Sequence, residues 1–132
     1  MNIKSSKELV EEANKLIEVM SPEQVKSSYD KGAITLVDVR DIRELWKEGT
    51  IKNSIHIPRG MLEFWLDPNS SYYQEKKIGD LKKIVLFCAL GFRSALATKS
   101  IKEMGFKNVA NAKGRFDALK NIGIPIIKKK KK

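Results

Sequence analysis

The chain has 132 residues, of which 42% are hydrophobic, so it suits one globular domain and excludes collagen-like and disordered classes. Its single cysteine excludes an internal disulfide, and no continuous apolar run has the length of a bilayer span. The formal net charge of +10, from 26 basic and 16 acidic residues, favours small anionic ligands.

The two ends of the chain bear on partners and location. The C-terminal run Lys128–Lys132 has no interleaved aromatic residues, so we expect a solvated tail with no nucleic-acid partner and no membrane binding. Glutamates interrupt the apolar positions of the N-terminal segment, which therefore lacks the pattern of a secretory signal. A cytoplasmic location is expected.

Helical and strand patterns alternate in the first third of the chain. Apolar residues at helical spacing predict an amphipathic helix over residues 5–20. A second helix is predicted after Ser21, its N-cap, with Pro22 in the first helical position. The apolar, β-branched run AITLVDVR then predicts a buried strand. A short helix follows over residues 41–49.

The rest of the chain continues the alternation. In order, it predicts a short strand (54–58), a turn or helix (60–66), a long loop (67–80), a buried strand (82–88), a helix (93–105), a strand (107–112) and a final helix (115–123). Strands alternating with helices imply a parallel sheet covered on both faces, with sites beyond the carboxyl ends of its strands. Asp38-Val39-Arg40 and the segment CALGFR both lie at such ends.

Cys88, the only cysteine, ends a strand and precedes a loop that leads into a helix. Consecutive amides at a helix N-terminus can form an anion-binding nest, and Gly91 supplies the backbone freedom of a tight loop. Arg93 adds a permanent positive charge, and together these features favour a reactive thiolate. The alternative is a buried cysteine that serves only as a small apolar side chain. We predict that Cys88 is a nucleophile.

The segment CALGFRSALA resembles the active-site loop of the rhodanese-domain sulfurtransferases. Cys88, Gly91, Arg93 and Ser94 match the Cys-x-x-Gly-x-Arg-Ser pattern of that loop. The upstream run LVDVRDIRELWKEGTIKNSIHIPRGMLEFWLDP and the closing run NVANAKGRFDALKNIGIPI resemble the rest of the family signature. The resemblance spans about residues 20–127, and the segment PRGMLEFWLDPNSSYY resembles a bacterial single-domain subgroup that carries this insertion and a preceding N-terminal helix.

The resemblance implies a fold and a domain organisation. The expected fold is an α/β sandwich around a five-stranded, mostly parallel sheet with helices on both faces, plus an N-terminal helix. We expect an N-terminal helical extension over residues 1–20, the rhodanese-like domain over residues 21–127 and a lysine tail over residues 128–132.

The resemblance also implies a two-step sulfur transfer. No cofactor is expected, and no metal, because one His and one Cys do not make a ligand set. The Cys88 thiolate would take sulfur from thiosulfate or a persulfide, including a persulfide on a protein partner. Cyanide or a thiol would then remove that sulfur from the Cys88 persulfide.

The resemblance implies roles for three groups of residues. Cys88 and Arg93 are the expected catalytic pair. The expected substrate-binding residues are Ala89, Leu90, Gly91, Phe92, Ser94 and Arg59. The expected structural residues are Asp38, Arg40 and Glu44, with an i, i+4 pair between Arg40 and Glu44.

The sequence departs from the family pattern at two positions, and two alternative functions remain. Gly114-Arg115 replaces the usual Gly-Gly, and Leu119 replaces a frequent Trp, which affects local packing more than chemistry. One alternative function is a noncatalytic binding module on the same fold. The other is a phosphatase or arsenate reductase, whose relatives on this fold have one more residue between Cys and Arg than the four found here.

Overall fold

The computed structural model describes residues 2–75 and 82–131 and is built around one five-stranded sheet. Its strands are all parallel and lie in the order β1 (Glu18–Met20), β6 (Val109–Ala112), β5 (Lys83–Phe87), β2 (Ile34–Asp38) and β4 (Ile55–His56). A short antiparallel pair joins β3 (Thr50–Ile51) to β7 (Ile126–Ile127). The predicted α/β fold with a five-stranded, mostly parallel sheet is confirmed.

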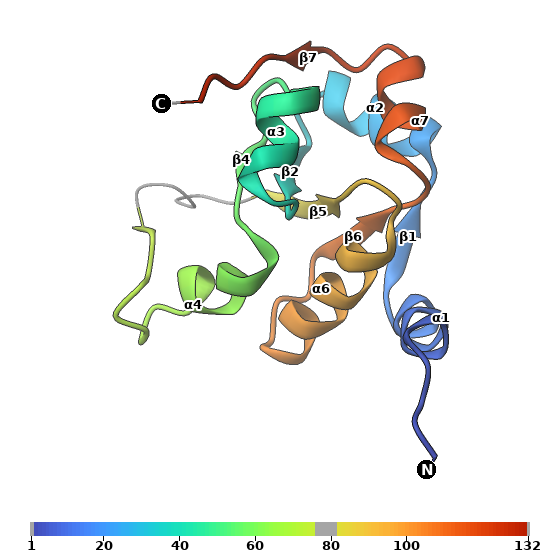
Figure 1. Ribbon diagram of the computed structural model, residues 1–132, viewed down its shortest axis with the longest axis vertical. Helices are drawn as coiled ribbons and strands as arrows, with labels where there is room; N and C mark the ends of the chain where they lie inside the picture. The colour runs from blue at the N-terminus through green and yellow to red at the C-terminus, as the bar shows by residue number, and fades with distance from the viewer. Residues whose placement is uncertain (1, 76–81, 132) are drawn as a thin grey trace.

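Helices cover both faces of the sheet, as predicted. Figure 1 looks along the sheet and shows two helical layers, one on either side of it. One layer consists of α1 (Ser6–Leu16), α4 (Leu62–Leu66) and α6 (Phe92–Glu103), and the 3₁₀ helix η1 (Arg59–Met61) leads directly into α4. The other consists of α2 (Pro22–Asp30), α3 (Ile42–Glu48) and α7 (Phe116–Asn121).

The central strands are buried on both faces, so each contributes side chains to two hydrophobic cores. Ile84 and Leu86 of β5 pack with Ile101 of α6 in one core. Val85 and Phe87, which point to the opposite face, pack in the other core. This alternation explains why β5 is apolar throughout its length rather than at every second residue. The sheet is thereby held in place from both sides.

The start of α2 follows the sequence prediction closely. The Ser21 side chain accepts a hydrogen bond from the Gln24 amide at 3.2 Å, and the Gln24 side chain accepts one from the Ser21 amide at 2.8 Å. Pro22 occupies the first turn, where its missing N–H has no helical partner to lose. This capping box fixes the entry into α2.

The predicted helix over residues 5–20 is wrong at its C-terminal end. Helix α1 ends at Leu16, and Glu18–Met20 form the edge strand β1, which pairs with β6. The β-branched Val19 suits a strand, and Met20 is buried against the sheet. Burial at the sheet edge outweighs the local helical pattern in this segment.

The predicted loop over residues 67–80 lies only partly within the described residues. Residues 67–75 form turns, in which the Asp67 side chain accepts a hydrogen bond from the Asn69 amide at 2.9 Å. Residues 76–80 lie outside the described part of the chain. Among the described residues, no helix combines the length and apolarity needed to cross a lipid bilayer.

A buried ion pair stands at the carboxyl end of β2. Asp38 and Arg40 both have 0% exposed side chains, and Arg40 Nη2 lies 2.9 Å from Asp38 Oδ2. Arg40 also donates to the Gly49 carbonyl at 2.7 Å, and Thr50 donates to Asp38 at 2.7 Å. The structural role expected for Asp38 and Arg40 therefore has a geometric basis.

The pair expected between Arg40 and Glu44 is wrong. Arg40 precedes Asp41, the N-cap of α3, so it lies outside the helix in which an i, i+4 pair would form. Its guanidinium turns inward to Asp38, and Glu44 instead binds Arg93.

Loss of Asp38 should destabilise the fold strongly. In an Asp38→Ala variant, the Arg40 guanidinium stays buried without its carboxylate, which costs about 3–5 kcal/mol. Urea unfolding measures the loss. Lys4→Ala, which breaks an exposed pair with Glu12, is the control and should cost less than about 1 kcal/mol. Equal losses in the two variants would contradict the buried pair as a structural support.

Candidate active site

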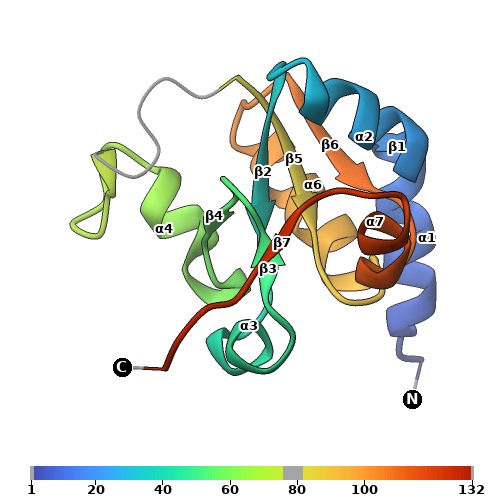
Figure 2. The same ribbon diagram turned by 90° about the horizontal axis from the view of Figure 1, so that it is seen from above.

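The loop after β5 turns sharply at Gly91 before α6 begins. Gly91 has a φ of +89°, in the left-handed region that side chains other than glycine rarely adopt. A Cβ on Gly91 would lie 3.2 Å from the Gly114 carbonyl oxygen, and the Phe116 amide donates to the Ala89 carbonyl at 2.9 Å. The loop is thus packed against the turn before α7, as Figure 2 shows. The φ of Gly91 favours glycine strongly, and the close Gly114 carbonyl adds to this preference.

Main-chain amides converge on the sulfur of Cys88. The Gly91 amide donates to Sγ at 3.1 Å, and the Ser94 amide donates to it at 3.4 Å. The thiol in turn donates to Ser94 Oγ at 3.3 Å. Cys88 is only 2% exposed and packs beside apolar core residues, yet its sulfur faces polar donors. The loop therefore brings Cys88, Gly91 and Ser94 together.

Four further amides of the loop have no acceptor in the part of the chain that the structure describes. Among the described residues, the N–H groups of Ala89, Leu90, Phe92 and Arg93 donate to no main-chain or side-chain atom of the chain. The first N–H groups of a helix lack intrahelical acceptors, and such groups bind anions readily. This end of α6 can therefore donate hydrogen bonds to an anionic ligand.

Arg93 points to a carboxylate rather than to the sulfur. Its guanidinium forms two hydrogen bonds with Glu44 of α3, at 2.7 and 3.1 Å. The hydrogen bond to Glu44 raises the pKa of Arg93, with smaller contributions from the charges of Cys88 and Asp38. The hydrogen bond from Arg93 lowers the pKa of Glu44. The charge of Cys88 therefore acts on Arg93, but the N–H groups of the Arg93 guanidinium are hydrogen-bonded to Glu44.

Arg59 is held away from the cysteine loop. Its Nη1 donates to both carboxylate oxygens of Glu63, at 3.0 and 2.9 Å, and Glu63 also accepts from Ser100 of α6. This cluster joins η1, α4 and α6. The structure does not bring Arg59 into contact with Cys88.

Two apolar side chains of the loop face solvent. Leu90 is 45% exposed and Phe92 is 57% exposed. Phe92 and Arg93 border an apolar groove of about 680 Å³ between α1 and the start of α6, which Val10 lines from the other side. Exposed apolar side chains therefore lie next to the cysteine loop.

Asn111 is the site residue that the sequence analysis missed. It lies in β6 with 2% of its surface exposed, accepts from Ser94 Oγ at 2.6 Å and donates to the Gly91 carbonyl at 3.3 Å. An amide inside the apolar run VANA was the available signal, since a buried polar side chain needs partners.

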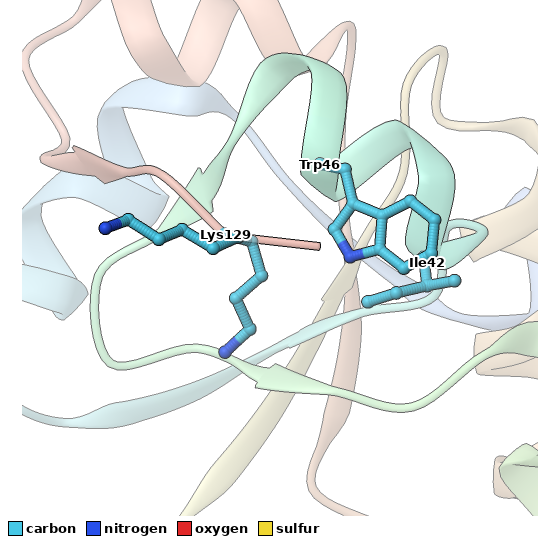
Figure 3. A pocket seen from close by; sticks show the side chains of 4 residues that line it. Ile42, Trp46 and Lys129 are labelled. Carbon is cyan, nitrogen blue, oxygen red and sulfur yellow. The ribbon is translucent and has the colours of Figure 1, made fainter. Parts of the chain in front are cut away.

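The lysine tail passes over α3. Figure 3 shows a hollow there, lined by Ile42, Trp46, Lys129 and Lys130. The Lys131 ammonium lies 5.4 Å from the centre of the Trp46 ring, within range of a cation–π contact. Residues 128–131 are exposed, as expected, but they lie along the protein.

The two departures from the family pattern fit the structure without strain. Gly114 has a φ of +87° and makes the turn before α7, whereas Arg115 is exposed at the start of that helix. Leu119 is 2% exposed and fills the core beneath α7. Among the described residues, no group of three or more His, Cys, Asp or Glu side chains is placed to hold a metal ion.

Comparison with known proteins identifies relatives over most of the chain. The rhodanese-like domain model matches residues 21–122. A rhodanese domain-containing protein of Drosophila melanogaster is 33% identical over 99 residues, which cover 72% of this chain and 89% of the relative.

Two solved structures are similar over nearly the full length. A Rhodopseudomonas palustris protein of unknown function, described as a possible tyrosine phosphatase, is 40% identical with a TM-score of 0.88, and the match covers 96% of this chain and 97% of that one. The polysulfide-sulfur transferase homodimer of Wolinella succinogenes is 33% identical with a TM-score of 0.69, over 93% of this chain and 87% of that one.

The Glu44–Arg93 pair should make a pH-dependent contribution to stability. Because the pKa of Glu44 is lowered in the folded state, its contribution is present above the unfolded value and is lost as pH falls through the folded value. Near neutral pH, the free energy of unfolding of wild type should exceed that of Glu44→Gln by less than about 1 kcal/mol, since the pair is partly exposed. Urea unfolding at falling pH should show this difference closing in the acid range. A difference that stays constant with pH would contradict the pair.

Proposed function

The chain belongs to the rhodanese-like domain family, and on that premise we propose that it is a sulfurtransferase that carries sulfane sulfur as a Cys88 persulfide. The observation that carries this proposal is the convergence of the Gly91 and Ser94 amides on Sγ. Amides aimed at a sulfur stabilise it as an anion, and the thiolate is the nucleophilic form of cysteine.

The first step loads the cysteine. The Cys88 thiolate attacks the outer sulfur of thiosulfate, a sulfur–sulfur bond forms, and the bond to the sulfonate sulfur breaks. Sulfite leaves with the electron pair of that bond, and Cys88 becomes a persulfide anion. With a persulfide donor, the same attack releases the donor's thiolate instead. Charge balances in both cases, and neither needs an external oxidant.

The second step removes the sulfur from the Cys88 persulfide. Cyanide attacks the outer sulfur of the Cys88 persulfide and leaves as thiocyanate, which regenerates the thiolate. A cellular thiolate attacking the same sulfur leaves as a new persulfide. The acceptor must come from outside the chain, because Cys88 is the only cysteine. A small thiol, cyanide or a protein cysteine fits this role.

The loop supports an anionic outer sulfur. The amides of Ala89, Leu90, Phe92 and Arg93 have no acceptor within the described residues and are available to a ligand. A persulfide extends beyond Sγ by one atom, so its negative end needs donors other than those already bound to Sγ. The amides at the start of α6 are the nearest such donors in sequence.

Arg93 serves as a second anchor for an anionic donor. The Arg93 side chain is 41% exposed and its guanidinium is hydrogen-bonded to Glu44, so a thiosulfate ion would compete with this carboxylate. A persulfide donor carries less negative charge than thiosulfate and depends less on Arg93. This competition favours a persulfide as the better donor.

Phosphoryl transfer is the second candidate, because the similar Rhodopseudomonas protein is described as a possible tyrosine phosphatase. Four residues separate Cys88 from Arg93, one fewer than in the related phosphatases, so fewer amides surround an incoming group. Phosphoryl transfer also depends on a positioned cation, and Glu44 engages Arg93. The geometry favours sulfur over phosphate. Hydrolysis of p-nitrophenyl phosphate, lost in Cys88→Ser, would reverse this assignment.

Incubation with a sulfane donor should load Cys88. Intact-mass measurement after treatment with thiosulfate or glutathione persulfide should show one added sulfur atom, which cyanide removes as thiocyanate. Cys88→Ser should show neither the adduct nor thiocyanate, while its unfolding transition stays close to that of wild type. No adduct from any donor, with the thiol still open to alkylation, would exclude the catalytic reading and favour a noncatalytic binding module.

Arg93 and Glu44 should affect thiosulfate use in opposite directions. Arg93→Ala should lower kcat/KM for thiosulfate by about tenfold or more, since a hydrogen bond to a charged group is worth about 1.5–3 kcal/mol. Glu44→Gln should raise it, because the guanidinium becomes free to bind the donor.

The control for this pair is Arg43→Ala on the same helix, whose guanidinium is exposed and bound to Asp41. It should leave kcat/KM unchanged in a steady-state thiocyanate assay. Unchanged values in the Arg93 and Glu44 variants would show that the donor binds without Arg93.

A further inference from the structure

Asn111 is buried in the middle of β6, yet each end of its side-chain amide has a partner. Its Oδ1 accepts the Ser94 hydroxyl at 2.6 Å, and its Nδ2 donates to the Gly91 carbonyl at 3.3 Å. Its second Nδ2 proton is directed to Asn14 Oδ1 of α1, also at 3.3 Å. A buried amide without such bonds would cost several kcal/mol, so these contacts are constraints on the fold around it.

The two loop residues held by Asn111 are the residues whose amides bind the sulfur. Gly91 and Ser94 donate their N–H groups to Sγ, and Asn111 holds the carbonyl of one and the hydroxyl of the other. From this geometry we propose that Asn111 is a positioning residue of the sulfur site: it fixes the loop from the sheet side so that both amides point at Cys88. This inference rests on the proposed function of Cys88.

The orientation of the Asn111 amide follows from its partners. The Gly91 carbonyl is an acceptor only, so the NH₂ end of Asn111 must face it. The oxygen end then faces Ser94, which has one hydroxyl proton to give. A flipped amide would place oxygen against oxygen at Gly91. The arrangement is therefore set by chemistry and has one stable form.

Asn111 also determines where the Ser94 proton goes. In the thiol state, Ser94 Oγ accepts from Cys88 and donates to Asn111. Once the thiol has lost its proton, the hydroxyl has two acceptors: Asn111 Oδ1 at 2.6 Å and Sγ at 3.3 Å. The shorter bond to Asn111 holds the hydroxyl proton away from the sulfur, which leaves main-chain amides as its principal donors.

The charged groups near the sulfur are separate from this network. Arg93 of α6 is paired with Glu44 of α3, and its pKa is raised by that hydrogen bond and by the charges of Glu44, Cys88 and Asp38. Asp38, at the end of β2, is paired with Arg40. No substitution at position 111 removes any of them. A change in the ionisation of Cys88 on substitution of Asn111 would therefore report the geometry of the loop.

The test compares Asn111→Ala with Thr98→Val. Alanine flanks position 111 on both sides in β6, so it suits the strand, and it removes both bonds to the loop. Thr98 is a buried side chain that donates to the Ser94 carbonyl at 2.7 Å and does not reach the sulfur. Valine keeps its shape and removes only that bond. The readout is the pH midpoint of the thiolate absorbance, taken as the difference from Cys88→Ser.

Asn111→Ala is made in a Ser94→Ala background and compared with that background, because in wild type the freed Ser94 hydroxyl could donate to the sulfur in place of the lost donors. In this background it should move the midpoint upward, since the sulfur anion loses an aligned amide, and should slow persulfide formation about tenfold at neutral pH. Thr98→Val should leave the midpoint where wild type has it. If the alanine variant does not fold, Asn111→Ser, with a shorter side chain, replaces it with the same expected shift.

A folded Asn111 variant with an unchanged midpoint overturns the inference. The absorbance readout needs no sulfur transfer, so a failure of this inference can be told apart from a failure of the proposed function. A shifted midpoint together with a wild-type protein that transfers no sulfur would uphold Asn111 as a positioning residue and remove the sulfurtransferase assignment alone.

Discussion

The site depends on one backbone constraint, the left-handed turn at Gly91. With a φ of +89°, this residue reverses the chain between β5 and α6, so that its own N–H and that of Ser94 reach the same sulfur atom. A Cβ at this position would lie 3.2 Å from the Gly114 carbonyl oxygen, so a side chain would crowd the neighbouring turn as well as strain the backbone. Everything that follows in the loop, including the direction of α6 and the placement of Arg93, starts from this turn.

The amides matter because the sulfur is almost fully buried. An ion removed from water costs several kcal/mol even after relaxation. Hydrogen bonds to a charged group are worth about 1.5–3 kcal/mol each, so two of them offset a cost of that size. The nearby side-chain cations contribute less, because Arg93 is bound to Glu44 and Arg40 is bound to Asp38. On the proposed function, main-chain amides rather than free side-chain charges are therefore the groups that stabilise an anionic sulfur.

The sequence predicts most of the fold because its signals are local, and it fails where partners are distant. Apolar runs and the Ser21 cap determine the strands and α2, whereas β1 forms because β6 offers it an edge, which no local pattern in residues 18–20 reveals. At the site, the Cys-to-Arg spacing predicts a tight loop, but the partner of Arg93 comes from α3, across a long sequence separation. Asn111 was missed for the same reason. Its contacts join three separate segments, and single-sequence patterns carry no record of them.

The N-terminal segment before residue 21 also contacts the residues around the cysteine loop. The family match begins at residue 21, yet the preceding residues supply an edge strand of the sheet and a helix that packs on α6. Lys102 of α6 donates to the Leu16 carbonyl at 2.6 Å, and Asn14 accepts from Asn111. Helix α1 therefore borders the groove beside Phe92 and also contacts the amide that holds the cysteine loop. Because one helix forms both contacts, whatever shifts α1 against α6 changes the groove and the support of the sulfur together.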